Sequence, residues 1–257
     1  MKLELEGRTA LVCGASQGLG YAIAEGLAAE GVRVGLFARN GAKLAERAKA
    51  LEARGLKAMA LAGDLGDFAS VEKALASFGS VDILVCNTGG PPAGKPDHVD
   101  PDLWRSQFEA MVLNQMRLVS LCLPSMRARK FGRIVNVAST SVVEPIGYLP
   151  LSGPLRAALA NWLKALSDAV ARDGITVNTL LTGSFSTERI DKLNATAAAA
   201  RGVAVEAIVA ETSAAIPAGR YGSPEEFADV AVFLASARAS YVTGQMIGID
   251  GGAMRSM

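Results

Sequence analysis

The chain has few of the residues that build metal sites and disulfide frameworks. Among its 257 residues are one histidine and three cysteines, and aromatic residues make up 5%. Cys13, Cys86 and Cys122 stand in apolar stretches at spacings that suit neither a metal site nor a set of disulfides. His98, in a polar loop rich in proline, has no second ligand at a suitable spacing. We therefore predict no metal and a reducing compartment, the cytoplasm.

An excess of charge of one sign is also missing. Lys and Arg number 26 and Asp and Glu number 25, which leaves a formal net charge of +1. This balance gives no electrostatic case for a nucleic acid or a membrane surface as partner. The chain contains neither a basic start followed by an apolar run nor a long uninterrupted apolar stretch. We expect a protein that is neither exported nor membrane-spanning and that acts on a small molecule.

Short aliphatic runs alternate with longer amphipathic segments, the pattern of βαβ units. The runs predict strands over residues 8–13, 32–38, 58–62, 81–87, 133–138, 175–181 and 246–249. The amphipathic segments predict helices over 21–31, 42–55, 68–78, 101–129 (one helix or two abutting ones), 154–173 and 223–235. The pattern predicts an α/β fold, a Rossmann-type doubly wound parallel sheet of about seven strands with helices on both faces.

No repeat, linker or change of composition marks a second domain, so we predict a single domain over residues 1–257. Residues 186–216 are rich in alanine and carry no strand pattern. We interpret them as mobile helices that cover a substrate. Glu188, Arg189 and Asp191 at the start of this segment could meet a polar substrate, although a solvated helix start is the interpretation we favour.

Three glycines follow the first predicted strand and precede the first predicted helix. Gly14 permits a tight turn, Gly18 removes a side chain where backbone must approach a pyrophosphate, and Gly20 lets helix and strand pack closely. The amides and dipole of the following helix favour negative charge. This context predicts a dinucleotide site, with a purely structural turn as the alternative.

The spacing Gly14-x3-Gly18-x-Gly20 resembles that of the short-chain dehydrogenase/reductase family, and the resemblance extends over nearly the whole chain. Further similar segments are Asp64, Cys86-Asn87-Thr88-Gly89, the strand 132–139 that ends at Ser139, the loop 177–187, and segments 217–226 and 244–252. Two of them depart from the family pattern, with Thr88 in place of alanine and Thr182-Gly183 in place of Pro-Gly. The resemblance implies the Rossmann fold and oxidoreductase activity.

The resemblance also implies a set of cofactor-binding residues. Asp64 corresponds to the family's adenine contact, and Thr187 to the residue that holds the nicotinamide carboxamide. The full set is Gly14, Ser16, Gln17, Gly18, Leu19, Gly20, Arg39, Asn40, Asp64, Leu65, Asn87, Thr88, Gly89, Arg156, Thr182, Gly183 and Thr187.

The end of the second predicted strand indicates which dinucleotide binds. A carboxylate there would hold the ribose hydroxyls of NAD, but the strand ends in Ala38-Arg39-Asn40. Arg39 places a guanidinium where a 2′-phosphate would lie, and its planar donor fork suits phosphate. Gln17 adds no second positive charge. We predict NADP(H) in preference to NAD(H), with a solvated Arg39 as the alternative.

The catalytic position departs from the family. The usual Tyr-x-x-x-Lys, thirteen residues after the serine, is here Ser152-x-x-x-Arg156. Serine is a far weaker acid than tyrosine, and arginine supplies fixed charge but cannot relay protons. Tyr148 could reach the pocket from a different backbone position. Alternatively, Ser139 and Ser152 orient the carbonyl while a water held by Asn114 and a backbone carbonyl delivers the proton.

The resemblance is to the 3-oxoacyl-carrier-protein reductase branch. It implies NADP(H)-dependent hydride transfer between nicotinamide and a carbonyl or alcohol substrate, similar to a 3-oxoacyl thioester and possibly carrier-bound, with Ser139 polarising the carbonyl. The main alternative is a dinucleotide-binding regulatory or structural homologue without turnover; a more remote one is a noncatalytic subunit that stabilises an active paralogue. Segments 102–129 and 154–173 resemble the family's dimer-forming helices, so we predict a homodimer or homotetramer.

Overall fold

The computed structural model describes residues 1–256. Seven parallel strands form one sheet in the order β3-β2-β1-β4-β5-β6-β7. They are β1 (Thr9–Cys13), β2 (Arg33–Ala38), β3 (Ala58–Ala62), β4 (Ile83–Cys86), β5 (Gly132–Val137), β6 (Ile175–Thr182) and β7 (Met246–Ile249). The chain starts in the middle of the sheet and winds out to both edges, so the predicted Rossmann-type fold is confirmed.

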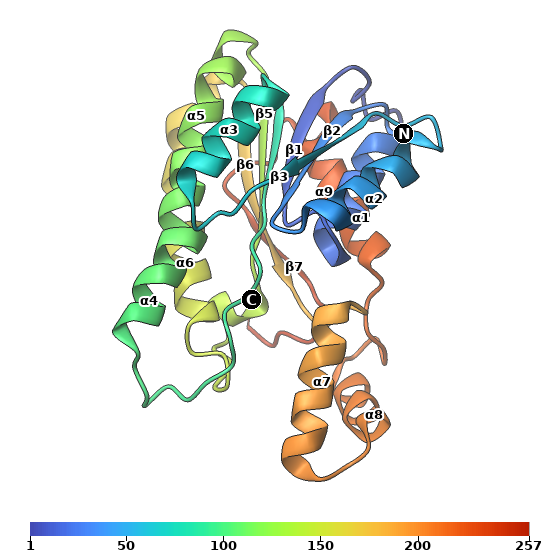
Figure 1. The fold of residues 1–257 in the computed structure, drawn as a ribbon, viewed down its shortest axis with the longest axis vertical. Helices are drawn as coiled ribbons and strands as arrows, with labels where there is room; N and C mark the ends of the chain where they lie inside the picture. The colour runs from blue at the N-terminus through green and yellow to red at the C-terminus, as the bar shows by residue number, and fades with distance from the viewer. Residues whose placement is uncertain (257) are drawn as a thin grey trace.

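Helices cover both faces of the sheet (Figure 1). One face packs against α1 (Gly18–Ala29), α2 (Gly41–Glu52) and α9 (Pro224–Ala235), and the other against α3 (Phe68–Phe78), α5 (Asn114–Ala128) and α6 (Ser152–Val170). All residues of β4 and β5 are buried, as expected of central strands covered on both faces. The two apolar layers leave the carboxyl ends of the strands free for a site.

The helix starts follow local side-chain chemistry. Ser223 and Glu226 form a capping box at the start of α9, with Pro224 in its first turn, and Asp67 caps α3. These contacts satisfy backbone N–H groups that have no partner inside the helix. They explain why both helices begin where the sequence predicts.

The predicted helix over residues 101–129 consists of two α-helices with a π-helical segment between them. α4 (Pro101–Phe108) runs into the π-helical residues Glu109–Leu113, and α5 follows from Asn114. A π-helical segment turns the residues after it relative to a continuous α-helix, and such segments are frequent at functional sites. Here the segment sets the direction of the side chains at the start of α5.

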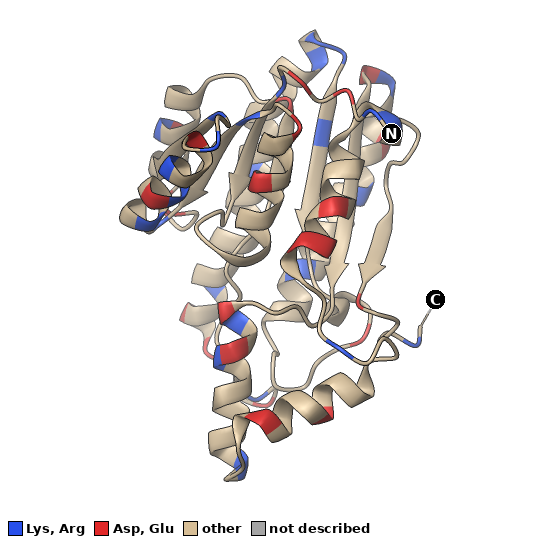
Figure 2. Ribbon diagram, turned by 90° about the vertical axis from the view of Figure 1, so that its right-hand side faces the viewer, with Lys and Arg blue, Asp and Glu red and all other residues tan. Residues whose placement is uncertain are grey.

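Residues 186–216 form two helices, α7 (Glu188–Arg201) and α8 (Val205–Ala215), as the sequence predicts. They project beyond the carboxyl ends of the strands (Figure 1). Basic and acidic residues are interspersed over the helices and loops seen in Figure 2, in keeping with the near-zero net charge.

Within residues 1–256, no single helix has the length and apolarity needed to cross a membrane. Helices α7 and α8, which are bent by 112° relative to each other, together reach the required length and apolarity, by length and composition only.

Candidate active site

The predicted site residues gather at the carboxyl edge of the sheet. The glycine turn follows β1, Asn87 and Thr88 follow β4, Ser139 follows β5, and Thr182 ends β6. The strand order reverses between β1 and β4, and ligands of open α/β sheets bind outside the carboxyl ends of the strands at such a switch point. The fold therefore places the predicted residues where a ligand crevice is expected.

The glycine turn has the backbone conformation that its sequence requires. Gly14 and Gly18 have φ values of +63° and +57°, in the left-handed region that favours glycine. A Cβ on Gly20 would collide with the carbonyl oxygen of Gly14, and a Cβ on Gly14 would lie 2.7 Å from Nδ2 of Asn87. Asn87 Nδ2 donates a hydrogen bond to the carbonyl oxygen of Cys13 over 3.2 Å, which ties the ends of β4 and β1 together.

The first turn of α1 fits a pyrophosphate. Gln17 occupies the N-cap position, and no side chain caps the helix within residues 1–256. Uncapped amides and the helix dipole together form an anion site. Thr187 Cγ2 would lie 3.5 Å from a Cβ on Gly18, so Thr187 lies across this turn at the start of α7. The glycine turn and the start of α7, both parts of the site that the sequence resemblance implies, therefore face each other.

Lys43, four residues after Arg39, brings a second positive charge close to the glycine turn and was not among the predicted site residues. Arg39 is exposed at the end of β2, and the Asn40 side chain accepts a hydrogen bond from Lys43 N over 3.0 Å. Lys43 Nζ donates to Gln17 Oε1 over 2.7 Å and pairs with Glu188 Oε1 at 2.8 Å. An Asn cap three residues before a lysine was the sequence signal for this placement.

In the part of the chain that the structure describes, the side chain of Asn114 hydrogen-bonds to Leu65 and Arg117 and not to Ser139 or Ser152. Its Nδ2 donates to the carbonyl oxygen of Leu65 over 2.7 Å, and its Oδ1 accepts from Arg117 Nη1 over 3.1 Å. Within residues 1–256 no hydrogen bond joins Asn114 to Ser139 or Ser152. Leu65 follows Asp64, so Asn114 supports the loop assigned to the adenine. The water-holding role of Asn114 stays a prediction.

Ser139 and Ser152 both sit at helix starts. Ser139 caps the short 3₁₀ segment Thr140–Val142, and its Oγ accepts hydrogen bonds from Ser141 N over 3.1 Å and Ser141 Oγ over 3.0 Å. Ser152 is the first residue of α6 and is buried. Because a hydroxyl has one donor and two acceptor positions, the Ser139 O–H stays available to donate to a ligand.

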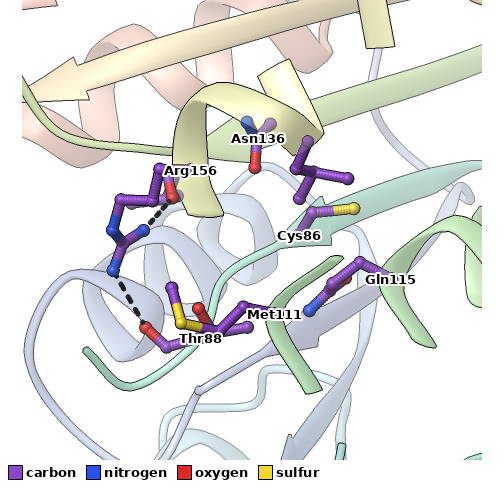
Figure 3. A pocket seen from close by; sticks show the side chains of 8 residues that line it. Cys86, Thr88, Met111, Gln115, Asn136 and Arg156 are labelled. Atoms are coloured by element: carbon purple, nitrogen blue, oxygen red, sulfur yellow. Dashed lines mark hydrogen bonds between the residues drawn. The ribbon is translucent and has the colours of Figure 1, made fainter. Parts of the chain in front are cut away.

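Arg156 lies one turn after Ser152 on α6 and spans the site. Its Nε donates to Ser152 Oγ over 3.2 Å. Its Nη1 donates to the carbonyl oxygen of Val137 over 2.8 Å, and Nη2 lies 3.5 Å from the carbonyl oxygen of Thr88 (Figure 3). Burial, aided by the positive charge of Arg189, lowers the pKa of Arg156 to about 10. The guanidinium therefore stays protonated at neutral pH.

A small cavity lies beside Arg156, with an empty volume of about 220 Å³ that includes some open solvent (Figure 3). Its lining residues are Cys86, Thr88, Met111, Gln115, Asn136, Val137, Arg156 and Leu159. Gln115 is fully buried, and neither end of its carboxamide has a hydrogen-bond partner within residues 1–256. No sequence pattern predicted this residue, because one glutamine in an amphipathic helix carries no signal.

Tyr148 is the exposed member of the predicted catalytic set. Its side chain is 60% exposed, and within residues 1–256 its hydroxyl makes no hydrogen bond. Its backbone carbonyl accepts from Gly94 N over 3.1 Å, which links two surface loops. Its part in the reaction stays a prediction.

The loop after β6 closes the other side of the crevice. Thr182 Oγ1 donates to the carbonyl oxygen of Ala138 over 3.0 Å. A Cβ on Gly183 would lie 2.6 Å from Cα of Asp250, so this position has no room for a side chain. Thr187 caps α7 by accepting from Ile190 N over 3.4 Å. These contacts fix the path of the chain from the sheet to α7.

The cysteines and the histidine do not contribute reactive groups. All three cysteines are free and buried, and burial raises the pKa of Cys13 and of Cys122 to about 12 and that of Cys86 well above its ordinary value. They are therefore thiols at neutral pH. His98 is exposed, and residues 1–256 contain no group of three or more His, Cys, Asp or Glu that could hold a metal ion.

Comparison with known proteins agrees with this geometry. The family model described as Enoyl-(Acyl carrier protein) reductase matches residues 14–254. The NADPH-dependent reductase BacG of Bacillus subtilis is 32% identical over 97% of this chain and 99% of that protein. The 3-oxoacyl-[acyl-carrier-protein] reductase FabG of Escherichia coli is 33% identical, over 97% and 98%.

Solved structures are similar over the whole chain. L-sorbose reductase from Gluconobacter frateurii, complexed with NADPH and L-sorbose, gives a TM-score of 0.93 at 33% identity and full coverage of both chains. A short chain dehydrogenase/reductase family protein gives 0.84 at 31% identity, covering 98% of each chain. The chain is an oxidoreductase of Rossmann fold. It belongs to the short-chain dehydrogenase/reductase family, which confirms the predicted family.

Proposed function

We propose that this protein is an NADP(H)-dependent carbonyl reductase in which Ser152 and Arg156 stand where the family carries its tyrosine and lysine. The observation that carries the proposal is the 3.2 Å hydrogen bond from Arg156 Nε to Ser152 Oγ. Ser152 accepts from a cation, so its own O–H can donate to a substrate oxygen. The serine is thereby a polarised hydrogen-bond donor next to a fixed positive charge.

The residues of the crevice fit NADP(H). The uncapped amides of α1 suit the pyrophosphate, and Thr187, across the turn, suits the nicotinamide carboxamide. Arg39 and Lys43 bring positive charge to the end of β2, where the 2′-phosphate would lie, which favours NADP(H) over NAD(H). The names of the reductase BacG and of the sorbose reductase complex, which specify NADPH, support this choice.

The bound dinucleotide supplies a hydride to the carbonyl carbon of the substrate. As that bond forms, the π electron pair of the carbonyl moves to its oxygen, which becomes negative and then takes one proton from water. Ser139 and Ser152 donate hydrogen bonds to this oxygen, and the charge of Arg156 stabilises it. Donors placed where negative charge develops are typically worth about 10²–10³ in rate each. These residues need not be acids themselves.

A small-molecule carbonyl compound is the substrate, with a carrier-bound 3-oxoacyl thioester suggested by the similarity to FabG. The chain acts as one domain and as a homodimer or homotetramer, with residues 186–216 over the substrate. A homologue without turnover is the second candidate, motivated by Ser152 and Arg156. The curated relatives, which are named as reductases, do not favour it.

The experiment that tests the proposal combines turnover with binding. NADPH absorbance is followed with a panel of ketones and 3-oxoacyl thioesters, and NADPH-induced thermal stabilisation is measured on the same protein. We expect stabilisation together with NADPH oxidation by at least one carbonyl class. Stabilisation by NADPH without turnover on any substrate would defeat the reductase and favour the homologue that binds but does not react.

A further inference from the structure

Two arginines at the site bind only neutral acceptors. Arg156 donates to Ser152 Oγ and backbone carbonyls, as described above. Arg189, in the first turn of α7, donates from Nη1 to the carbonyl oxygen of Gly90 over 3.3 Å. Arg156 Nη2 lies 3.5 Å from the carbonyl oxygen of Thr88, two residues before Gly90. Both guanidiniums therefore reach the same short segment after β4.

The positive charge of this pair is not balanced by the protein. Within residues 1–256, neither Arg156 nor Arg189 has a carboxylate oxygen within 4.0 Å. Glu188, next to Arg189, is held by Lys43 at 2.8 Å. The amino end of α7 adds positive potential from the helix dipole.

Desolvation makes this unbalanced charge costly. Burial lowers the pKa of Arg189 and, together with the charge of Arg189, that of Arg156. Arg156 is half-buried, whereas Arg189 is exposed. A cation that is partly removed from water without a carboxylate partner is unfavourable, and an anion bound between the two arginines offsets that cost for Arg156.

The position of Arg189 depends on a glycine. A Cβ on Gly90 would collide with the Arg189 guanidinium, so any other residue at this position would displace the arginine or the loop. Gly90 thus leaves the space that the Arg189 guanidinium occupies. Arg189 is held across the crevice from α7 to the segment after β4, over the place where the substrate is expected.

We propose that Arg156 and Arg189 bind a carboxylate of the substrate, which makes the substrate a free oxo acid in place of the 3-oxoacyl thioester that the similarity to FabG suggests. This inference rests on the proposed function, since it assigns part of the same substrate. Arginine forks match a carboxylate with two parallel hydrogen bonds. Because Ser152 Oγ lies 3.2 Å from Arg156 Nε, a carbonyl at Ser152 and a carboxylate at Arg156 are separated by a few bonds. A 2-oxo or 3-oxo acid has this spacing.

The cofactor pyrophosphate is the other source of an anion, and the test distinguishes the two. Oxo acids and their methyl esters are compared as matched pairs on the wild type, Arg189→Gln and Lys192→Gln. Lys192→Gln removes one positive charge from an exposed position of the same helix and serves as the control. Steady-state kcat/KM and the Kd for NADPH are measured for each variant.

We expect the wild type to prefer acid over ester by about tenfold or more, the effect of one charge-assisted contact. Arg189→Gln should abolish this preference by lowering the kcat/KM for acids to that for esters, while the Kd for NADPH stays unchanged. Lys192→Gln should keep the preference. Equal turnover of acids and esters by the wild type overturns the proposal. So does an Arg189→Gln variant that binds NADPH more weakly but keeps the preference, because the anion is then the pyrophosphate.

A binding measurement keeps failure of this inference separate from failure of the proposed function. Thermal stabilisation of the NADP⁺-saturated enzyme is recorded with each acid and ester. If no substrate is turned over, stabilisation by acids that is lost in Arg189→Gln supports the carboxylate site although the reductase is refuted. If esters are reduced and acids neither stabilise nor react, the reductase stands and the carboxylate site is overturned.

Discussion

Arg156 Nε donates a hydrogen bond to Ser152 Oγ over 3.2 Å, between residues one turn apart at the start of α6. The hydrogen bond from Arg156 Nη1 to the Val137 carbonyl oxygen holds the guanidinium at the end of β5, close to Ser139. This pair gives the site a donor and a permanent charge in place of an acid. In the proposed function, Ser139, Ser152 and Arg156 therefore bind the carbonyl oxygen, and water delivers its proton.

Replacing Ser152 by alanine should lower kcat by about 10²-fold, the typical loss when one donor to a developing oxyanion is removed. The Kd for NADPH should not change, since the proposed partner of Ser152 is the substrate oxygen and not the cofactor. Steady-state kinetics and NADPH titration check both quantities. Ser120→Ala serves as the control, because that hydroxyl only donates to the carbonyl of Met116 on the exposed side of α5. An unchanged kcat would remove Ser152 from the mechanism.

Replacing Arg156 by lysine should not restore the family's usual chemistry. Lysine supplies a point charge but lacks the fork that reaches Ser152 and Val137 at once. We expect kcat to fall by roughly tenfold or more, because the Ser152 hydroxyl loses its fixed partner. The double variant Ser152→Tyr with Arg156→Lys tests whether an acid alone limits the rate. An Arg156→Lys variant with the kcat of the wild type would show that a positive charge at this position is sufficient for turnover without the guanidinium fork.

Arg39→Ala should weaken NADPH binding by about tenfold or more and leave NADH binding unchanged, since a charge-assisted contact to phosphate is lost. Isothermal titration with both dinucleotides measures the change in specificity. Arg105→Ala, which removes an exposed arginine of α4, is the matched control. Equal weakening of both dinucleotides would place Arg39 outside the 2′-phosphate site and leave Lys43 as the candidate.

The sequence predicts the fold well because local chemistry decides most elements. α3 and α9 begin at the predicted positions since Asp67 and Ser223 cap them, and β3 and β7 match the predicted ranges. The π-helical segment Glu109–Leu113 has no distinctive composition, so its effect on Asn114 was beyond prediction.

The sequence predicts the fold better than it predicts which side chains contact one another in the site. The glycine turn and Asn87 have their predicted places because backbone sterics specify them. Lys43 and Gln115 were missed, since their partners lie in other elements and depend on tertiary packing. The exposure of Tyr148 likewise depends on a loop path between two prolines that no periodicity describes. Residues fixed by local geometry were predictable, and those fixed by long-range contacts were not.

Gly20→Ala should disrupt the glycine turn. The added methyl group would collide with the carbonyl oxygen of Gly14 and lie 2.8 Å from Asn87 Nδ2. We expect a loss of stability on the order of 1–3 kcal/mol, typical of overpacking, and loss of NADPH-induced stabilisation. Urea unfolding and thermal shift measure the two effects. Gly147→Ala, where a Cβ meets nothing within 4 Å, is the control; a Gly20→Ala variant as stable as this control would contradict the structure.

The capping box of α9 should make stability depend on acid pH. The Arg220 guanidinium and the Ser223 backbone N–H lower the pKa of Glu226 to about 2, against about 4.3 for a free glutamate. Because the folded pKa is the lower one, the carboxylate stabilises the fold above pH 5, and this contribution is lost as the pH falls toward 2. Glu226→Gln should therefore lower Tm at pH 7.

The difference in Tm between the wild type and Glu226→Gln should shrink between pH 5 and pH 2, in the window set by the two pKa values. Thermal unfolding followed by circular dichroism at several pH values measures it. Glu225→Gln, one residue away in the same first turn, is the control. A Tm difference for Glu226→Gln that stays constant from pH 7 to pH 3 would show that the carboxylate does not titrate with its Arg220 contact.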